Sequence, residues 1–108
     1  MSLPDEDRVS KAVDYLVKTD EPWARACAAL EAAEMAAKQE REIAFLEAEG
    51  TQGEKAAKAN SSGRVKLAGK AVEAAVFEKE LLKARRGTAL VVIDVWRSLN
   101  SNRRAGIV

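Results

Sequence analysis

RVKLAGKAVEAAVFEKELLKARRGTALVVIDVWRSLNSN, residues 64–102, is the stretch that decides the fold. Its apolar side chains recur at alternating three- and four-residue steps, through Val65, Ala68, Val72, Ala75, Leu82, Ala89, Ile93 and Trp96. This spacing places them along one face of a helix, as in the seam of a coiled coil. Lys79 and Arg86 interrupt the seam. The stretch therefore predicts one long helix that packs against another helix.

A second apolar stripe runs along the same stretch, through Leu67, Ala71, Ala74, Leu81, Val92, Val95 and Leu99. A helix with two apolar stripes has to be covered on two sides. We therefore expect its C-terminal part to pack against a helix of its own chain and against a neighbouring subunit. The predicted subunit interface consists of Leu90, Val91, Ile93, Val95, Trp96 and Leu99.

Residues 88–96 also allow a different interpretation, because they are rich in β-branched side chains that favour a buried strand. The segment resembles the first strand of isochorismatase-type hydrolases, in which an aspartate ends such a run. That fold needs most of its chain after this strand, together with parallel partner strands and a nucleophilic cysteine. The sequence offers no second strand candidate, so we prefer the helix.

The first half of the chain predicts a second long helix. Residues 23–49 contain neither proline nor glycine and consist largely of strong helix formers, and Gly50 is suited to cap the end. Residues 19–22, Thr-Asp-Glu-Pro, predict a break, with a short separate helix over 5–18 before it. Thr51 and Glu54 have the spacing of a capping box and predict a short helix over 54–59, followed by a loop over 60–63.

These elements predict an all-α fold, a long antiparallel helical hairpin with a short N-terminal helix and a short connecting helix. We expect it to be coiled-coil-like and oligomeric, because alanine-rich helices bury little apolar area each and aromatic residues make up only 5% of the chain. With 108 residues the chain is expected to form a single helical domain over 1–108. Residues 1–4 are expected to be disordered or left over from an expression vector.

Composition argues against several kinds of chemistry. The chain has no histidine and a single cysteine, Cys27, so neither a histidine-activated nucleophile nor an internal disulfide is available. No glycine-rich phosphate loop is found. We therefore expect no enzyme activity, no cofactor and no metal. The longest apolar run, Ala89 to Ile93, is far too short to span a membrane, and with no signal peptide the expected location is the cytoplasm.

Charge is divided unevenly along the chain. Residues 1–50 hold twelve acidic and six basic side chains, whereas residues 51–108 hold five acidic and twelve basic ones. Such asymmetry is typical of proteins that bind nucleic acid or that associate through opposite faces. The basic side chains of the second half include a cluster near the central turn, which has only Glu54 as an acidic neighbour in the sequence, and an arginine pair near the end. The predicted nucleic-acid contacts are Lys55, Lys58, Arg64, Lys66, Lys70, Arg103 and Arg104.

Other roles remain open for these residues. The central cluster is equally consistent with a solvated surface or with a partner for an acidic helix. Arg86 has Glu34 and Glu40 as candidate partners within a helical assembly. Trp23 and Trp96 are possible stacking platforms for single strands, but both lie on apolar stripes, which favours packing roles.

The layout from about Ala32 to Ile107 resembles the UvsY-type recombination mediators of bacteriophages. Its most distinctive parts are FEKELLKARR (77–86), the aliphatic segment 89–99 and NSNRR (100–104). The resemblance implies a small helical protein of phage or prophage origin that forms a ring through its C-terminal helix. It also implies binding of single-stranded DNA and loading of a recombinase in a bacterial cytoplasm. The family's basic positions late in the first long helix fall near Glu42 and Ala44. The DNA contact that the family makes through those positions therefore does not carry over to this chain.

Two functions follow as expectations. The first is a non-enzymatic DNA recombination or replication accessory protein that binds single-stranded DNA as a homo-oligomer, without sequence preference. The alternative is a structural or adaptor protein of a phage or prophage, which assembles through its helices without binding DNA.

Overall fold

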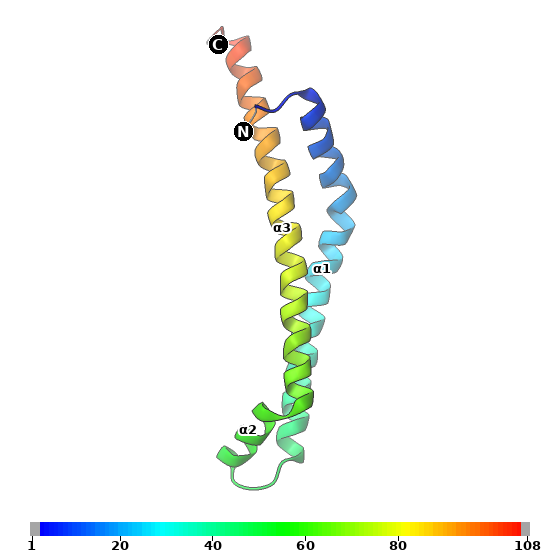
Figure 1. The fold of residues 1–108 in the computed structure, drawn as a ribbon, viewed down its shortest axis with the longest axis vertical. Helices are drawn as coiled ribbons and strands as arrows, with labels where there is room; N and C mark the ends of the chain where they lie inside the picture. Colours follow the sequence, from blue (N-terminus) through cyan, green and yellow to red (C-terminus); the bar gives the residue numbers. More distant parts are fainter. Residues whose placement is uncertain (1–2, 107–108) are drawn as a thin grey trace. The chain divides into compact units, whose positions relative to one another are not determined.

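The computed structural model describes residues 3–106 and is entirely helical in its regular structure (Figure 1). Helix α1 spans Glu6–Glu47, helix α2 spans Gln52–Ser61 and helix α3 spans Gly63–Arg104. α1 and α3 are the arms of a long antiparallel helical hairpin, and α2 lies in their connection. This confirms the predicted all-α fold with a long helical hairpin. The strand interpretation of residues 88–96 is wrong, because the whole segment lies within α3.

The described residues form two compact units, each built from a segment of α1 and an antiparallel segment of α3. Unit 1 contains residues 3–24 and 80–106, and unit 2 contains residues 25–79, including α2. The predicted seam of α3 is confirmed in both units, since all eight of its apolar residues are buried or half-buried. The periodic spacing therefore identified the face of α3 that packs within the chain.

The core is made of small side chains. Its buried residues are Val9, Ala12, Ala37, Ala44, Ala59 and Ala89, and no large side chain among residues 3–106 is fully buried. Alanine allows two helices to approach closely, but each alanine removes little apolar area from water. Many large apolar side chains stay exposed on the surface of the single chain.

α1 runs without interruption through Pro22, so the predicted break and the separate helix over 5–18 are wrong. Leu16, Thr19 and Trp23 follow one another on the half-buried face that packs on α3. Pro22 itself is exposed. Packing of the neighbouring turns on α3 therefore outweighs the cost of proline within a helix. The predicted start of this helix agrees with the structure: Asp5 directly precedes α1, and its Oδ1 accepts a hydrogen bond of 2.8 Å from the backbone N–H of Arg8.

The turn after α1 follows the predicted capping rules. Gly50 has φ +118°, a conformation that disfavours side chains. The hydroxyl of Thr51 caps α2 by accepting the backbone N–H of Glu54 at 3.3 Å. α2 is longer than the predicted 54–59, and the predicted loop over 60–63 shrinks to Ser62, which links α2 to α3. Ala59 of α2 is the most buried residue of the described chain, with 3% exposure.

The N-terminal segment before α1 is short. Leu3 and Pro4 precede α1 without regular secondary structure, whereas residues 1–2 lie outside the described residues. Within residues 3–106, none of the helices combines the length and the apolar character needed to cross a membrane.

Candidate nucleic-acid interface

Two cations of the predicted basic cluster, Arg64 and Lys58, are engaged by α1 and the turn that follows it within unit 2. The guanidinium of Arg64 lies 2.5 Å from the carboxylate of Glu40, measured from Nε to Oε2, and 3.4 Å from that of Glu47, measured from Nη1. The ammonium of Lys58 donates a 2.7 Å hydrogen bond to the backbone carbonyl of Glu49. The assumption that Glu54 is the only nearby acid is therefore wrong. Because α3 runs back along α1, Arg64 at its start lies next to Glu40 and Glu47.

Lys66 and Lys70 remain available on α3. They lie one helical turn apart, both are exposed, and neither forms an ion pair or side-chain hydrogen bond within residues 3–106. Leu67 lies between them and is 70% exposed. This part of the predicted contact set keeps its charge free for a ligand.

The charge asymmetry of the sequence largely disappears on folding. Unit 1 carries nine basic and eight acidic side chains, and unit 2 carries nine of each. The acidic first half of the chain lies antiparallel to the basic second half, so each unit combines both. Two arginines of the second half, Arg64 and Arg86, form ion pairs with carboxylates of α1. For ligand binding, the positions of the unpaired cations therefore matter more than the total charge.

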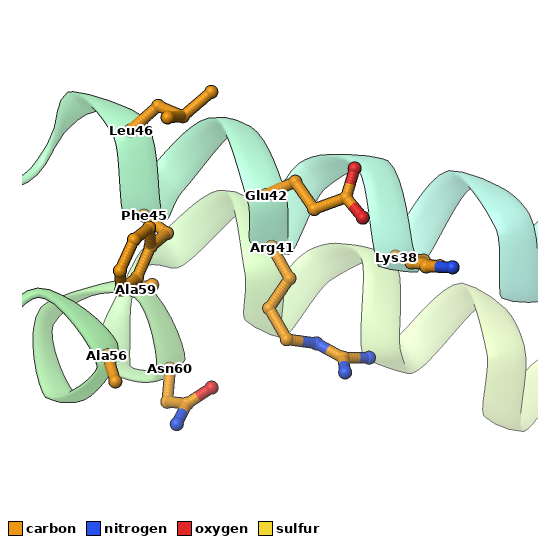
Figure 2. Close-up of a pocket in the computed structure, with 8 residues that line it drawn as sticks. All are labelled: Lys38, Arg41, Glu42, Phe45, Leu46, Ala56, Ala59 and Asn60. Carbon is orange, nitrogen blue, oxygen red and sulfur yellow. The ribbon is translucent and has the colours of Figure 1, made fainter. Parts of the chain in front are cut away.

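Unit 2 contains a groove of about 530 Å³ between the end of α1 and α2 (Figure 2). Phe45, Leu46, Ala56 and Ala59 give it an apolar lining. Its polar lining residues are Lys38, Arg41, Glu42 and Asn60. In Figure 2 the ring of Phe45 lies beside α2 at Ala59, while Arg41 and Asn60 extend from the two helices that border the groove.

The groove combines an aromatic ring with unpaired cations. Lys38 and Arg41 are exposed and make no ion pair within the described residues, and Glu42 is the one acidic lining residue. The ammonium of Lys55 lies 5.9 Å from the centroid of the Phe45 ring. Rings flanked by cations suit the stacked bases and the phosphates of single strands.

Sequence reasoning missed this groove. It treated the stretch around Lys38 and Arg41 as part of an acidic, solvated helix face. The signal that could have found it is the spacing of Lys38, Arg41, Glu42 and Phe45, which places all four on one side of α1. Nothing in the sequence, however, says that α2 folds back beside them.

The remaining predicted cations belong to unit 1. Arg103 and Arg104 are exposed in the last turn of α3. Arg86 does not pair with Glu34 or Glu40, as was considered possible. Its Nη1 donates to the carbonyl of Leu16 at 3.0 Å and to Thr19 Oγ1 at 2.6 Å, and its Nη2 donates to Asp20 Oδ1 at 2.8 Å.

The residues of the predicted subunit interface divide into two groups on α3. Leu90, Val91 and Val95 are exposed, with 52%, 61% and 37% of their surface accessible. Ile93, Trp96 and Leu99 are half-buried. The first group leaves an uncovered apolar surface on unit 1, which is what a subunit contact would require.

No family model matches the chain, and neither the curated proteins nor the solved structures contain a match to it.

Proposed function

We propose that this chain is a non-enzymatic DNA accessory protein that binds single-stranded DNA without sequence preference. The observation that carries the proposal is the groove of unit 2, which Phe45 lines together with the cations Lys38 and Arg41, while the ammonium of Lys55 lies 5.9 Å from the centroid of the Phe45 ring. An aromatic ring accepts any base by stacking, and neighbouring cations neutralise phosphates of any sequence.

In this proposal each part of the groove has a distinct role. A base stacks on the accessible part of the Phe45 ring, and the amide of Asn60 offers hydrogen bonds to its edge. Arg41 and Lys38 contact the adjoining phosphates, which Arg41 can bind with two parallel N–H donors. Lys66 and Lys70 supply further charge on α3 of the same unit.

Assembly increases the affinity of such a site. Leu90, Val91 and Val95 offer an apolar surface on unit 1 through which copies of the chain associate. Several grooves on one oligomer then bind one strand together, which raises the effective concentration of each site. The resemblance to UvsY-type mediators extends the proposal to a phage or prophage protein that loads a recombinase in a bacterial cytoplasm.

The thin core favours a second candidate function, a structural or adaptor protein that assembles without DNA. No large side chain among residues 3–106 is fully buried, and Leu46, Leu67 and Phe77 are all more than 60% exposed. Such a surface is typical of chains whose core is completed by partners. This candidate predicts assembly without affinity for oligonucleotides.

The two candidates differ in the fluorescence anisotropy of a labelled oligothymidylate titrated with the protein. The informative variants are Lys38→Gln/Arg41→Gln, which removes the phosphate contacts, and Phe45→Leu, which keeps an apolar side chain but removes the ring. Both should weaken binding, and only the first should reduce its salt dependence, by about 1.4 in the log–log slope for two phosphate contacts.

A matched control is Lys18→Gln/Lys83→Gln, which removes the same charge from exposed positions of unit 1. Circular dichroism of each variant verifies that the helices are intact. Equal binding by the groove variants and the control would refute the groove as the DNA site. Absence of binding by an assembled wild-type protein would refute the proposed function and favour the adaptor.

A further inference from the structure

Unit 1 contains a second groove, of about 340 Å³, between the start of α1 and the second half of α3. Its lining residues are Arg8, Lys11, Ala12, Tyr15, Arg85, Thr88 and Ala89. Ala12 and Ala89 are buried, with 8% and 7% exposure. Because both are small, they bring the helices together and leave the space between the larger flanking side chains unfilled.

The polar lining of this groove is positive. It includes three basic residues, Arg8, Lys11 and Arg85, and no acidic residue. Arg85 is exposed and makes no ion pair within residues 3–106. Lys11 pairs with Asp7 at 3.1 Å, but both side chains are about three-quarters exposed. Such a pair within one helix is weak, so an anionic ligand can redirect the ammonium.

Tyr15 adds a neutral donor to the three cations. It is half-buried in the groove wall, and its hydroxyl forms no hydrogen bond within the described chain. Thr88 differs, because its hydroxyl already donates to the carbonyl of Ala84 at 3.1 Å. The donors that a ligand would meet therefore come from Lys11, Tyr15 and Arg85.

We propose that this groove binds phosphate groups. Arg85 offers planar, forked donors, Lys11 offers a mobile charge, and the Tyr15 hydroxyl offers one further hydrogen bond. Several cations around a small volume suit a ligand that concentrates negative charge, as phosphate does. The ligand is either a nucleic-acid backbone or a free phosphate compound. The site lies in unit 1 and the proposed DNA groove in unit 2, so either proposal can fail alone.

Tyr15 is the only tyrosine of the chain, which makes it a specific reporter of this groove. We would incorporate 3-fluorotyrosine and record the single ¹⁹F resonance during titrations with pyrophosphate, with oligothymidylate and with citrate. Citrate carries similar charge on carboxylates and tests selectivity for phosphate. The expected result is a saturable shift with pyrophosphate and a much smaller effect of citrate at equal concentration and ionic strength.

The test variant is Lys11→Gln/Arg85→Gln, and the control is Lys18→Gln/Arg97→Gln, which removes the same charge from exposed positions of unit 1. The test variant should bind pyrophosphate at least about tenfold more weakly, since each charge-assisted hydrogen bond contributes on the order of a factor of ten. The control and Lys38→Gln/Arg41→Gln should retain binding. Circular dichroism verifies the helical content of all variants.

The probes separate the two phosphate sources. A Tyr15 shift with oligothymidylate, lost in the test variant, assigns the site to a nucleic-acid backbone, and a shift with pyrophosphate alone assigns it to a free phosphate compound. An unmoved resonance with both phosphate probes would overturn the inference, even if oligothymidylate binds in unit 2. An equal response to citrate, or unchanged binding by the folded test variant, would overturn it as well.

Discussion

Units 1 and 2 are built from the same two helices, but their cations differ in burial and in the groups that they contact. In unit 1, Arg86 is only 19% exposed and binds the backbone and side chains of α1 through three hydrogen bonds. In unit 2, Arg64 is 45% exposed and contacts carboxylates near the turn. The unpaired cations, Arg85 in unit 1 and Arg41 in unit 2, line grooves instead. The comparison teaches that each cation's role depends on its position relative to the seam.

Arg86 should be the more important of the two cross-helix arginines. Replacing it in Arg86→Met keeps much of the apolar stem but leaves the Leu16 carbonyl, Thr19 and Asp20 without their partner. We expect the free energy of unfolding to fall by about 3 kcal/mol, the scale for hydrogen bonds to a partly buried charge. Urea unfolding followed by circular dichroism measures it. A loss below about 0.5 kcal/mol would show that the contact is not stabilising.

Pro22 gives unit 1 a weakness that unit 2 lacks. Pro22→Ala restores a backbone N–H in the middle of α1 and removes the crowding of the preceding turn. It should raise the free energy of unfolding by about 2 kcal/mol, within the known cost of proline inside a helix. The control Ser10→Ala, at another exposed position of α1, should change stability by only a few tenths. A decrease for Pro22→Ala would mean that unit 1 requires the local geometry of proline.

Gly50 tests the turn of unit 2. Its φ of +118° is unfavourable for any side chain, and an added Cβ would collide with the carboxylate of Glu54. Gly50→Ala should lower the free energy of unfolding by about 1 kcal/mol. Gly53→Ala is a matched control, because Gly53 is helical and a Cβ there meets open space, so alanine should stabilise α2 by about 0.5 kcal/mol. Equal effects at both positions would contradict the described turn.

Replacement of Arg64 should change the free energy of unfolding least. Arg64→Met removes ion pairs whose side chains are between 33% and 66% exposed, so we expect a loss of at most about 1 kcal/mol. A double-mutant cycle with Glu40→Gln isolates the coupling between the two residues. A coupling as large as the whole effect of Arg86→Met would remove the distinction between the units.

Periodicity predicted the helical part of this structure well. The seam of α3 from Val65 to Trp96, the capping of α2 by Thr51 and the role of Gly50 all follow from short-range rules. The break at Pro22 was wrong because local propensity does not include packing against α3 or the contacts of Arg86. The local sequence therefore predicted that the helices exist, whereas the continuation of α1 through Pro22 depended on tertiary contacts.

The candidate sites were harder to predict. The basic cluster was identified by neighbours in sequence, yet Arg64 meets Glu40 and Glu47 only after the chain reverses. The grooves depend on α2 lying beside Phe45 and on Ala12 meeting Ala89, and both follow from the register between helices. A single sequence gives the periodicity of each helix but not that register.

The most direct test of the central claim is the salt dependence of oligothymidylate binding by the wild-type protein. Binding through lysine and arginine contacts releases counterions, so the association constant should fall steeply and linearly with salt on logarithmic axes. We predict that the logarithm of the association constant falls against the logarithm of the salt concentration with a slope of about −1.4 or steeper, as expected for two phosphates contacted by Lys38 and Arg41. The account would be contradicted by a helical protein that does not bind at low salt, or whose binding is independent of salt.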